Sequence, residues 1–240
     1  MVRLLFEIYK WLVAYPLMII ITIIVTLFIA FGSKCFGSKW WGYFPAHIWG
    51  VCWCFLLFVK VKINGKENID KNTSYVFVAN HQGAYDIFTV YGYLGHNFKW
   101  MMKKSLEKIP FVGYACKKAG HIMVDKSSPA AVQRTMEMAE KQLRGGMSLV
   151  VFPEGSRSKT GKMARFKKGA FALATEFGLP IVPITIDGAY DVMPRAAKLP
   201  RPGHIRVTIH RPMSVADASM SELMDASYEA IHSALPEKYR

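Results

Sequence analysis

The sequence has few cysteines, and no pattern gives them a shared role. There are four in 240 residues, Cys35, Cys52, Cys54 and Cys116, and they are scattered along the chain. One residue separates Cys52 from Cys54, and neither a second pair nor a histidine stands at zinc-ligand spacing. We therefore expect a reduced compartment and cysteines that act as apolar filler, with no disulfide framework and no metal site.

Arrangements that activate a nucleophile are also missing. The chain contains no G-x-S-x-G turn, and none of its cysteines has a histidine or asparagine beside it in the sequence. Because such arrangements prepare serine or cysteine for covalent catalysis, the sequence gives no reason to expect a covalent enzyme intermediate. We also expect no cofactor.

Acidic residues are scarce relative to basic ones. Asp and Glu number 17 against 31 Lys and Arg, which gives a formal net charge of +14. This surplus indicates an anionic partner, either membrane phosphates, a phosphorylated substrate or nucleic acid. Charge alone does not separate these three.

Charge is absent altogether between Trp11 and Phe31. This run is long enough to cross a hydrocarbon layer, which takes roughly 20 apolar residues. One alternative is a cleaved signal peptide, since Ala30-Phe31-Gly32 offers a small-x-small site, and another is a buried core helix. We favour a membrane anchor, because the run is longer than a usual signal core and has no polar face.

A second apolar stretch, from Trp49 to Val59, is too short for another full crossing. The aromatic side chains around it are typical of the boundary between lipid tails and headgroups, although core packing would explain them equally well. They are Trp40, Trp41, Tyr43, Trp49 and Trp53. We expect residues 1–59 to form a membrane-associated helical hairpin.

Beyond residue 60, short β-like runs alternate with helical stretches, which is typical of an α/β domain. The expected strands are 59–63, 75–78, 99–102, 121–124, 149–152, 181–186 and 205–209. Most are short and apolar, as buried strands should be. We predict a mixed, mostly parallel sheet flanked by helices, in one domain over residues 60–240.

Two of the helices in this domain have recognisable ends. One is expected after Ser128, with Pro129 at its first position and Gly145-Gly146 as its stop. Its apolar stripe is Val132, Met136, Ala139 and Leu143. The last helix begins at Ser219, whose spacing to Glu222 is that of a capping box. Its core side is Leu223, Ile231 and Leu235.

Two polar turns that follow apolar strands hold the residues suited to chemistry. The first is Asn80-His81-Gln82-Gly83-Ala84-Tyr85-Asp86. A histidine can act as a general base near neutral pH, and a carboxylate five positions on can hold its tautomer and stabilise the imidazolium. Strand ends of this kind are where α/β folds place their sites. The spacing permits a dyad of His81 and Asp86, but it is weak evidence alone.

The second turn, Phe152-Pro153-Glu154-Gly155-Ser156-Arg157-Ser158, is rich in groups that bind anions. Arg157 can contact phosphate oxygens with two nitrogens, while Ser156 and the loop amides can add donors. Further cations follow, and a solvated surface or general attraction to anionic lipid explains each of them singly better than a ligand role does. They are Lys159, Lys162, Arg165, Lys167 and Lys168.

Together the two turns resemble the glycerolipid acyltransferase family typified by 1-acylglycerol-3-phosphate acyltransferase, whose hallmarks are N-H-x4-D and F-P-E-G-[ST]-R-S. Their order and separation also match. The segments 103–106, 109–113, 166–170 and 181–184 look like further blocks of that family. The resemblance covers residues 60–213.

The resemblance implies an O-acyltransferase of phospholipid biosynthesis. Such an enzyme moves a fatty acyl group from acyl-CoA or acyl carrier protein to the free hydroxyl of 1-acyl-sn-glycerol 3-phosphate (lysophosphatidic acid), giving phosphatidic acid. His81 would deprotonate that hydroxyl, Asp86 would orient His81, and the hydroxyl would attack the thioester directly. The phosphate side of the acceptor pocket would contain Glu154, Gly155, Ser156 and Arg157, with Gly155 allowing close backbone approach.

One position departs from the family pattern. Lys126 stands where the family usually has an arginine, which keeps the charge and loses the planar two-pronged contact. Phosphate selection would then be looser, or Lys126 is not a ligand. Lys104 would contact either the phosphate or the thioester oxyanion. His121 is more simply a strand residue than a second base.

Other interpretations stay open on the sequence alone. The same dyad would serve glycerol 3-phosphate, another lysophospholipid or an aminolipid as acceptor. In a non-catalytic basic membrane protein, His81 and Asp86 would only cap a helix. We expect anionic membrane lipid as a partner, no nucleic acid, and a catalytic domain at the cytoplasmic face of a membrane. The sequence leaves open the acyl donor and whether residues 11–31 cross the bilayer or turn back in one leaflet.

Overall fold

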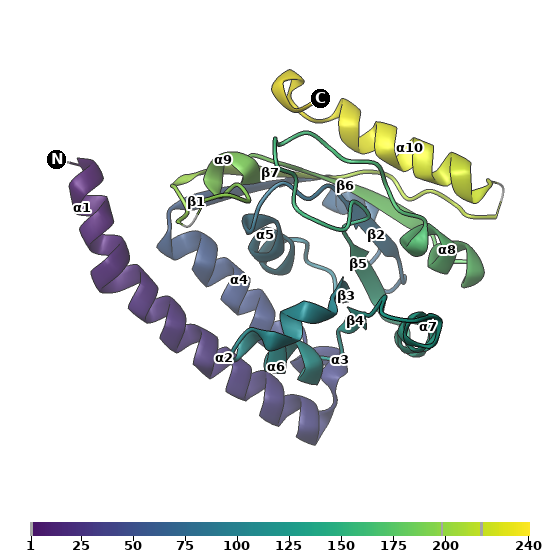
Figure 1. Cartoon of the computed structure of the whole chain (residues 1–240), viewed down its shortest axis with the longest axis horizontal. Coiled ribbons are helices and arrows are strands. Elements are labelled where there is room, and N and C mark those ends of the chain that lie inside the picture. Colours follow the sequence, from purple (N-terminus) through teal and green to yellow (C-terminus); the bar gives the residue numbers. More distant parts are fainter. Residues whose placement is uncertain (1, 198, 217) are drawn as a thin grey trace.

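The computed structural model describes residues 2–197, 199–216 and 218–240, and a seven-stranded sheet lies at its centre. The strands are ordered β1-β7-β6-β2-β5-β3-β4 (Figure 1). Their bounds are β1 Val59–Asn64, β2 Val76–Ala79, β3 Phe98–Lys103, β4 Ile122–Val124, β5 Ser148–Val151, β6 Ile181–Asp187 and β7 Gly203–Ile209. Every expected strand is present, with its ends only slightly shifted.

Helices fill most of the chain between the strands. The α-helices are α1 Val2–Tyr9, α2 Tyr15–Phe36, α3 Ser38–Trp41, α4 Phe44–Leu56, α5 Tyr85–Tyr93, α6 Val112–Lys118, α7 Pro129–Arg144, α8 Gly169–Glu176, α9 Ala189–Val192 and α10 Met220–Ser233. A π-helical segment, η1 Lys10–Ala14, joins α1 to α2. Short 3-10 turns are η2 Lys66–Asn68, η3 Lys104–Lys108 and η4 Glu237–Tyr239.

Most neighbouring strands run in the same direction. The block β6-β2-β5-β3-β4 is parallel throughout, whereas β7 is antiparallel to β6 and pairs in parallel with β1. The predicted mixed, mostly parallel sheet is therefore confirmed. Because parallel strands end on the same side, the loops that follow β2, β5, β3 and β4 meet along one edge of the sheet.

Different helices bury the two faces of the sheet (Figure 1). In β2, Val76 and Val78 pack toward α8 and α10, while Phe77 and Ala79 alternate toward α4 and α5. This alternation is the normal period of a strand. All four side chains are fully buried, which explains why the strand is a continuous apolar run in the sequence.

The two helices with recognisable ends begin where predicted. The Ser128 hydroxyl accepts the Ala131 amide at the start of α7, and Ser219 and Glu222 form the capping box of α10. The core side of α10 is also confirmed by Leu223 and Ile231, while Leu235 is buried just beyond the end of the helix at Ser233. The stripe predicted for α7 is partly wrong, because Val132 is 44% exposed. The helix instead turns Ala131, Thr135, Ala139 and Leu143 inward.

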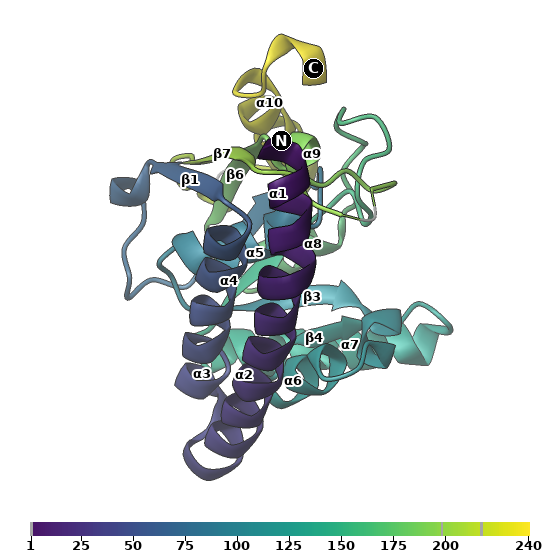
Figure 2. The ribbon, with the colours of Figure 1, turned by 90° about the vertical axis from the view of Figure 1, so that its left-hand side faces the viewer.

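The N-terminal helices form a hairpin beside the sheet (Figure 2). Residues Leu4–Phe36 make one helix of 33 residues that is long and apolar enough to cross a membrane, and only 22% of its most apolar window is buried. α3 turns the chain, and α4 returns alongside α2. An apolar helix so poorly covered by protein favours a lipid environment over a place in the core.

Helix α4 also packs closely against α5. A methyl group added at Gly50 would lie 2.6 Å from the carbonyl oxygen of Phe88, so only glycine allows this approach. The ring of Trp53 stacks on Phe88 with centroids 4.4 Å apart, and Trp49 meets the same ring edge-on at 4.9 Å. Core packing therefore accounts for Trp49 and Trp53, whereas Trp40 at the turn of the hairpin is exposed.

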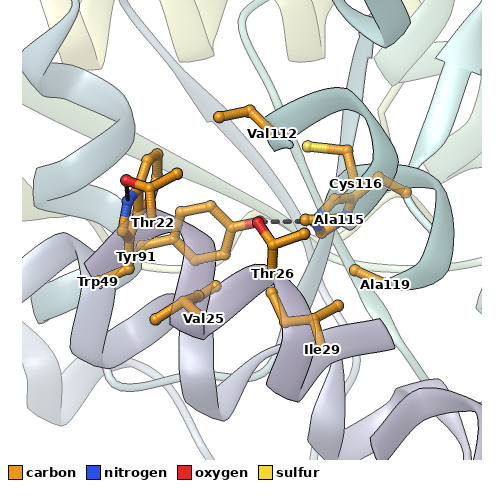
Figure 3. A pocket seen from close by; sticks show the side chains of 12 residues that line it. Thr22, Val25, Thr26, Ile29, Trp49, Tyr91, Val112, Ala115, Cys116 and Ala119 are labelled. Carbon is orange, nitrogen blue, oxygen red and sulfur yellow. Dashed lines mark hydrogen bonds between the residues drawn. The ribbon is translucent and has the colours of Figure 1, made fainter. Parts of the chain in front are cut away.

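Helices α2, α4, α5 and α6 surround a small apolar cavity of about 40 Å³ (Figure 3). Across it, Trp49 Nε1 donates to Thr22 Oγ1 at 2.9 Å. The Tyr91 hydroxyl is hydrogen-bonded to Nε2 of His121, whose Nδ1 lies 3.2 Å from the Trp100 amide. Burial lowers the pKa of His121 to about 3, so this histidine is a neutral core residue with both nitrogens occupied.

A buried lysine ties the turn of the hairpin to the sheet. The Lys99 ammonium on β3 donates to the carbonyl oxygens of Ser38, at 2.6 Å, and Ala119, at 2.7 Å. Burial lowers the pKa of Lys99 to about 8. The hairpin is thus fastened to the α/β part by polar contacts as well as by apolar packing.

Candidate functional site

The loop after β2 is fixed to its neighbours on both sides of His81. The Asn80 carboxamide both donates to and accepts from the backbone of Ile186 on β6, at 2.8 and 2.7 Å. The His81 carbonyl accepts the Ser158 amide at 2.8 Å. These bonds hold the backbone of the histidine between the end of β6 and the loop that follows β5.

His81 and Asp86 contact each other directly. His81 Nδ1 lies 2.7 Å from Asp86 Oδ2, and the same oxygen accepts the Gly83 amide at 2.9 Å. Asp86 lies in the first turn of α5, where the positive end of the helix dipole favours a carboxylate. Because a carboxylate only accepts, the proton of neutral His81 sits on Nδ1. The lone pair on Nε2 is then available to take a proton from a ligand.

Burial differs sharply between the two partners. The Asp86 side chain is completely buried, whereas the His81 side chain is 15% exposed. Asp86 Oδ1 is buried without a hydrogen-bond partner among the described residues. The carboxylate is therefore shielded from water, and only the imidazole can meet a ligand.

An aromatic ring supports the imidazole from one side. The rings of His81 and Phe152 stack with centroids 3.9 Å apart and planes 7° apart, and Phe152 stacks in turn on Trp100 at 5.3 Å. Phe152 follows β5, the strand beside β2. Phe152 opens the second turn, but the sequence alone predicts no role for it.

Glu154 joins the two turns. Its Oε1 accepts the His81 amide at 2.7 Å, and its Oε2 accepts the Ala164 amide at 2.8 Å. Burial raises its pKa to about 7, against the lowering effect of the same two amides. We expected Glu154 on the phosphate side of an acceptor. Its geometry gives that role no support, because backbone amides occupy both carboxylate oxygens.

Gly155 makes room for a cation. Its φ of 79° suits glycine, and a Cβ at this position would collide with the ammonium of Lys167. The main chain of Lys167 is held by its amide, which donates to the Pro153 carbonyl at 3.0 Å. Lys167 was one of several cations that the sequence could not rank, and only the folding of residues 162–168 over the turn distinguishes it.

Arg157 and Ser156 are the remaining members of this loop. Arg157 is partly buried and Ser156 is exposed, while Ser158 turns inward and donates to the Lys162 carbonyl at 2.7 Å. Within the described residues, no ion pair joins Arg157 or Lys167 to a carboxylate. Two cations without protein counter-ions therefore lie on the loops next to His81.

Lys104 and Lys126 lie farther along the same edge, after β3 and β4. The Lys104 ammonium is 2.7 Å from Asp125 Oδ2, and Lys126 is exposed. The hydrogen bond from Lys104 holds the pKa of Asp125 well below its usual range. In the described part of the chain, no hydrogen bond or ion pair links either lysine to His81, Asp86 or Arg157.

The site thus combines a base with a place for an anion. His81 Nε2 can accept a proton from a hydroxyl, and Arg157 and Lys167 on the adjoining loop are cations of the kind that bind an anion. The residues that the structure describes contain no group of three His, Cys, Asp or Glu side chains arranged for a metal ion.

Comparison with known proteins gives a consistent result. Residues 60–187 match the family model described as Acyltransferase. A 1-acyl-sn-glycerol-3-phosphate acyltransferase of Chlamydomonas reinhardtii is 31% identical over 230 residues, which are 95% of this chain and 68% of the algal protein. A chloroplastic enzyme of the same name from Arabidopsis thaliana is 37% identical over 169 residues, which are 69% of this chain and 47% of the plant protein. This chain therefore spans about two thirds of the algal relative and about half of the plant one.

A solved structure is similar over almost the whole fold. The crystal structure of the 1-acyl-sn-glycerophosphate (LPA) acyltransferase PlsC from Thermotoga maritima superposes with a TM-score of 0.81 and 27% sequence identity. The match covers 96% of this chain and 93% of that one. It therefore includes the N-terminal helices as well as the sheet.

Proposed function

Because this chain belongs to the acyltransferase family, we propose that it transfers a fatty acyl group from an acyl thioester to the free hydroxyl of 1-acyl-sn-glycerol 3-phosphate. The product would be phosphatidic acid, an intermediate of phospholipid synthesis. The names of the relatives support this acceptor. The observation that carries the proposal is the 2.7 Å contact between His81 and Asp86 beside the Arg157 loop.

The proposed reaction needs one base and no covalent intermediate. His81 Nε2 takes the proton of the acceptor hydroxyl as its oxygen attacks the thioester carbonyl. The tetrahedral intermediate collapses and expels the thiolate, and the imidazolium of His81 gives its proton to that thiolate. Asp86 stabilises that imidazolium and keeps the ring in place, and Phe152 supports its face.

The acceptor phosphate is proposed to bind at the loop after β5. Arg157 supplies two parallel donors, Lys167 adds a second cation, and Ser156 lies exposed between Gly155 and Arg157. Glu154 is proposed as a positioning residue, because it bonds the His81 amide and so fixes the distance between base and phosphate loop. Lys104 and Lys126 are proposed to add positive charge farther along the edge.

Membrane attachment through residues 1–59 completes the proposal. The long apolar helix would hold the protein at a bilayer, where a lysophospholipid acceptor resides. Anionic lipid would be attracted by the net charge of +14. We propose that residues 60–240 form the catalytic domain on the cytoplasmic side, where acyl-CoA and acyl carrier protein are both soluble donors.

Thiol release tests the reaction. Purified full-length protein is given an acyl thioester and lysophosphatidic acid, and we expect free thiol and phosphatidic acid in equal amounts. His81→Ala should abolish both, while His204→Ala, a change at an exposed histidine on β7, should alter neither. Equal release from wild type and His81→Ala would contradict the proposal. If turnover were faster with glycerol 3-phosphate, another lysophospholipid or an aminolipid, that compound would be the acceptor and the proposed mechanism would stand.

A further inference from the structure

The segment between β3 and β4 exposes apolar side chains in a part of the protein that lies outside the hairpin. It comprises η3, the turn 109–111 and α6, and we call it the 104–118 segment. Leu106, Ile109, Phe111 and Tyr114 are 39%, 43%, 52% and 53% exposed. Side chains of this size in one short stretch usually mark a contact surface.

Basic residues accompany these apolar side chains. Lys103, Lys104, Lys108, Lys117 and Lys118 are all exposed, and Glu107 is the one acidic residue between positions 103 and 118. The Lys118 ammonium lies 5.5 Å from the centre of the Tyr114 ring. Exposed apolar groups interleaved with lysine suit a surface that is apolar inside and anionic outside, as a phospholipid bilayer is.

The backbone at Phe111 is held in an unusual conformation. Its φ is 60°, a value that is rare for a bulky residue, and the Val112 amide closes a tight turn onto the Pro110 carbonyl at 2.6 Å. Thr26 on α2 donates to the Phe111 carbonyl at 3.5 Å. The anchor helix therefore holds the residue whose ring is turned outward.

The surface continues onto the anchor. α6 lies beside α2 (Figures 1 and 2). An open apolar groove of about 460 Å³ lies between α2 and the turn 109–111. Ile19 and Ile23 of α2 line one side of this groove, and Pro110 and Phe111 line the other. A lipid layer that covers the exposed side of α2 would reach the 104–118 segment without a break.

We propose that the 104–118 segment is a second membrane-contacting surface, in which Ile109, Phe111 and Tyr114 enter the interfacial layer and the lysines bind lipid phosphates. Together with the hairpin it would fix how the α/β part sits on the bilayer, and it begins where β3 ends, at the edge that carries His81. An acidic carrier protein would account for the lysines but not for the ring of Phe111 or for the continuity with α2. This inference rests on the proposed membrane attachment.

Hydrogen exchange of the intact protein tests it. The full-length chain is placed in nanodiscs of phosphatidylcholine alone or with phosphatidylglycerol added, and in detergent micelles as reference. We expect amides of residues 104–112 to exchange several-fold more slowly in the anionic nanodiscs than in either other medium. Residues 220–233 of α10, on the far side of the sheet, should not change (Figure 1).

Matched variants separate the two parts of the surface. Phe111→Gly removes the ring and relieves the positive φ, so folding is preserved while protection should be lost. Phe58→Gly makes the same change at another exposed phenylalanine with φ 53° and should leave the segment protected. Replacing Lys108, Lys117 and Lys118 by Gln should abolish the difference between the two lipids, whereas the same change at Lys60, Lys62 and Lys66 should not.

The outcomes are distinct. Protection of residues 4–36 without protection of 104–112 would overturn this inference and leave the anchor proposal intact. If neither residues 4–36 nor residues 104–112 were protected in nanodiscs, membrane attachment itself would be contradicted. Protection of 104–112 that appears only after acyl carrier protein is added, and is equal in both lipids, would assign the surface to a protein partner and overturn the lipid assignment.

Discussion

One carboxylate oxygen performs two tasks in the candidate site. Asp86 Oδ2 accepts hydrogen bonds from both His81 Nδ1 and the Gly83 amide. It therefore orients the base and shapes the loop that carries it. An asparagine in this place could keep one oxygen in the same position. It would not carry the charge that stabilises an imidazolium in a site closed to water.

Asp86→Asn should therefore lower kcat by about 10²- to 10⁴-fold, the usual contribution of general base catalysis, and leave the acceptor KM almost unchanged. Steady-state kinetics with thioester and lysophosphatidic acid measure both constants. Asp225→Asn, at an exposed position of α10, serves as the control. A raised KM with unchanged kcat would show that Asp86 acts on binding and not on the base.

Arg157→Ala should raise the acceptor KM and leave kcat almost unchanged, the opposite of Asp86→Asn. Loss of a charge-assisted contact with phosphate costs about 1.5–3 kcal/mol, which is a rise in acceptor KM of about 10- to 100-fold. Arg157→Lys should recover only part of this, because lysine lacks the two-pronged contact. Arg165→Ala removes an exposed cation nearby and should have little effect. An unchanged KM for Arg157→Ala would remove this loop from phosphate binding.

At the scale of residues, contacts between positions close in the sequence could be predicted, whereas contacts between neighbouring strands could not. The spacing of His81 and Asp86 permitted a dyad, because a turn and a helix start can bring them together, and the resemblance to the acyltransferase family supported the pairing. Phe152 stacks on His81 only because β5 is the neighbour of β2, with Val151 opposite Val78. Spacing within one strand does not reveal which strand lies beside it. The position of Lys167 was hidden for another reason, because it depends on how the long loop after β5 folds back over Gly155.

At the scale of elements, Glu154 joins the loops that follow β2 and β5, together with the hydrogen bond from the Ser158 amide to the His81 carbonyl. The two amides that it binds belong to different loops, and neither loop is held there by a regular strand ladder. A glutamine can accept one of these amides, but its own NH₂ would then face the other. Two donors would oppose each other in a buried place.

Glu154→Gln should lower the free energy of unfolding by about 1–3 kcal/mol, the cost of an unsatisfied buried donor, and should lower kcat because His81 is displaced. Chemical denaturation and kinetics at one pH measure the two effects. Glu140→Gln removes a surface ion pair with Arg144 and should cost only about 0.3–0.5 kcal/mol. If the Gln variant kept full stability and activity, Glu154 would not be needed to hold the two loops together.

The strands were predictable because buried parallel strands are short apolar runs. The ends of the helices were harder to predict from the sequence. The run from Trp11 to Phe31 marks only the middle of a helix that extends over Leu4–Phe36, and the stretch ending at Val59 includes the first residue of β1. Apolarity alone does not distinguish the end of a helix from the start of a strand. In the first half of α7 the stripe was misplaced by one position, since Ala131 and Val132 are equally compatible with an apolar face, whereas Ala139 and Leu143 are buried as predicted.

At the scale of the whole molecule, the hairpin and the α/β part share one core. Met18 and Ile29 of α2 and Cys54 of α4 belong to the same buried cluster as Phe77 of β2 and Phe88 of α5. A division of labour between an anchor, residues 1–59, and a catalytic domain, residues 60–240, stays a prediction. The shared core implies that the two parts unfold together.

Gly50→Ala tests this coupling. In an open helix the change would stabilise the protein by about 0.5–1 kcal/mol, because alanine is the better helix former. Here the added methyl group meets the Phe88 carbonyl, so α4 must move away from α5, the helix that carries Asp86. We expect a net loss of about 1–3 kcal/mol, the usual cost of overpacking, together with a lower kcat.

The control is another glycine at a helix. Gly169 is the first residue of α8, and nothing lies within 4 Å of a methyl group added there. Gly169→Ala should therefore be neutral or slightly stabilising. Denaturation in detergent, followed both by activity and by near-UV circular dichroism, should give one shared transition that Gly50→Ala shifts downward. A Gly50→Ala protein with unchanged activity and an unchanged transition would mean that the hairpin is an independent anchor, because strain at the α4–α5 contact would then not reach the base.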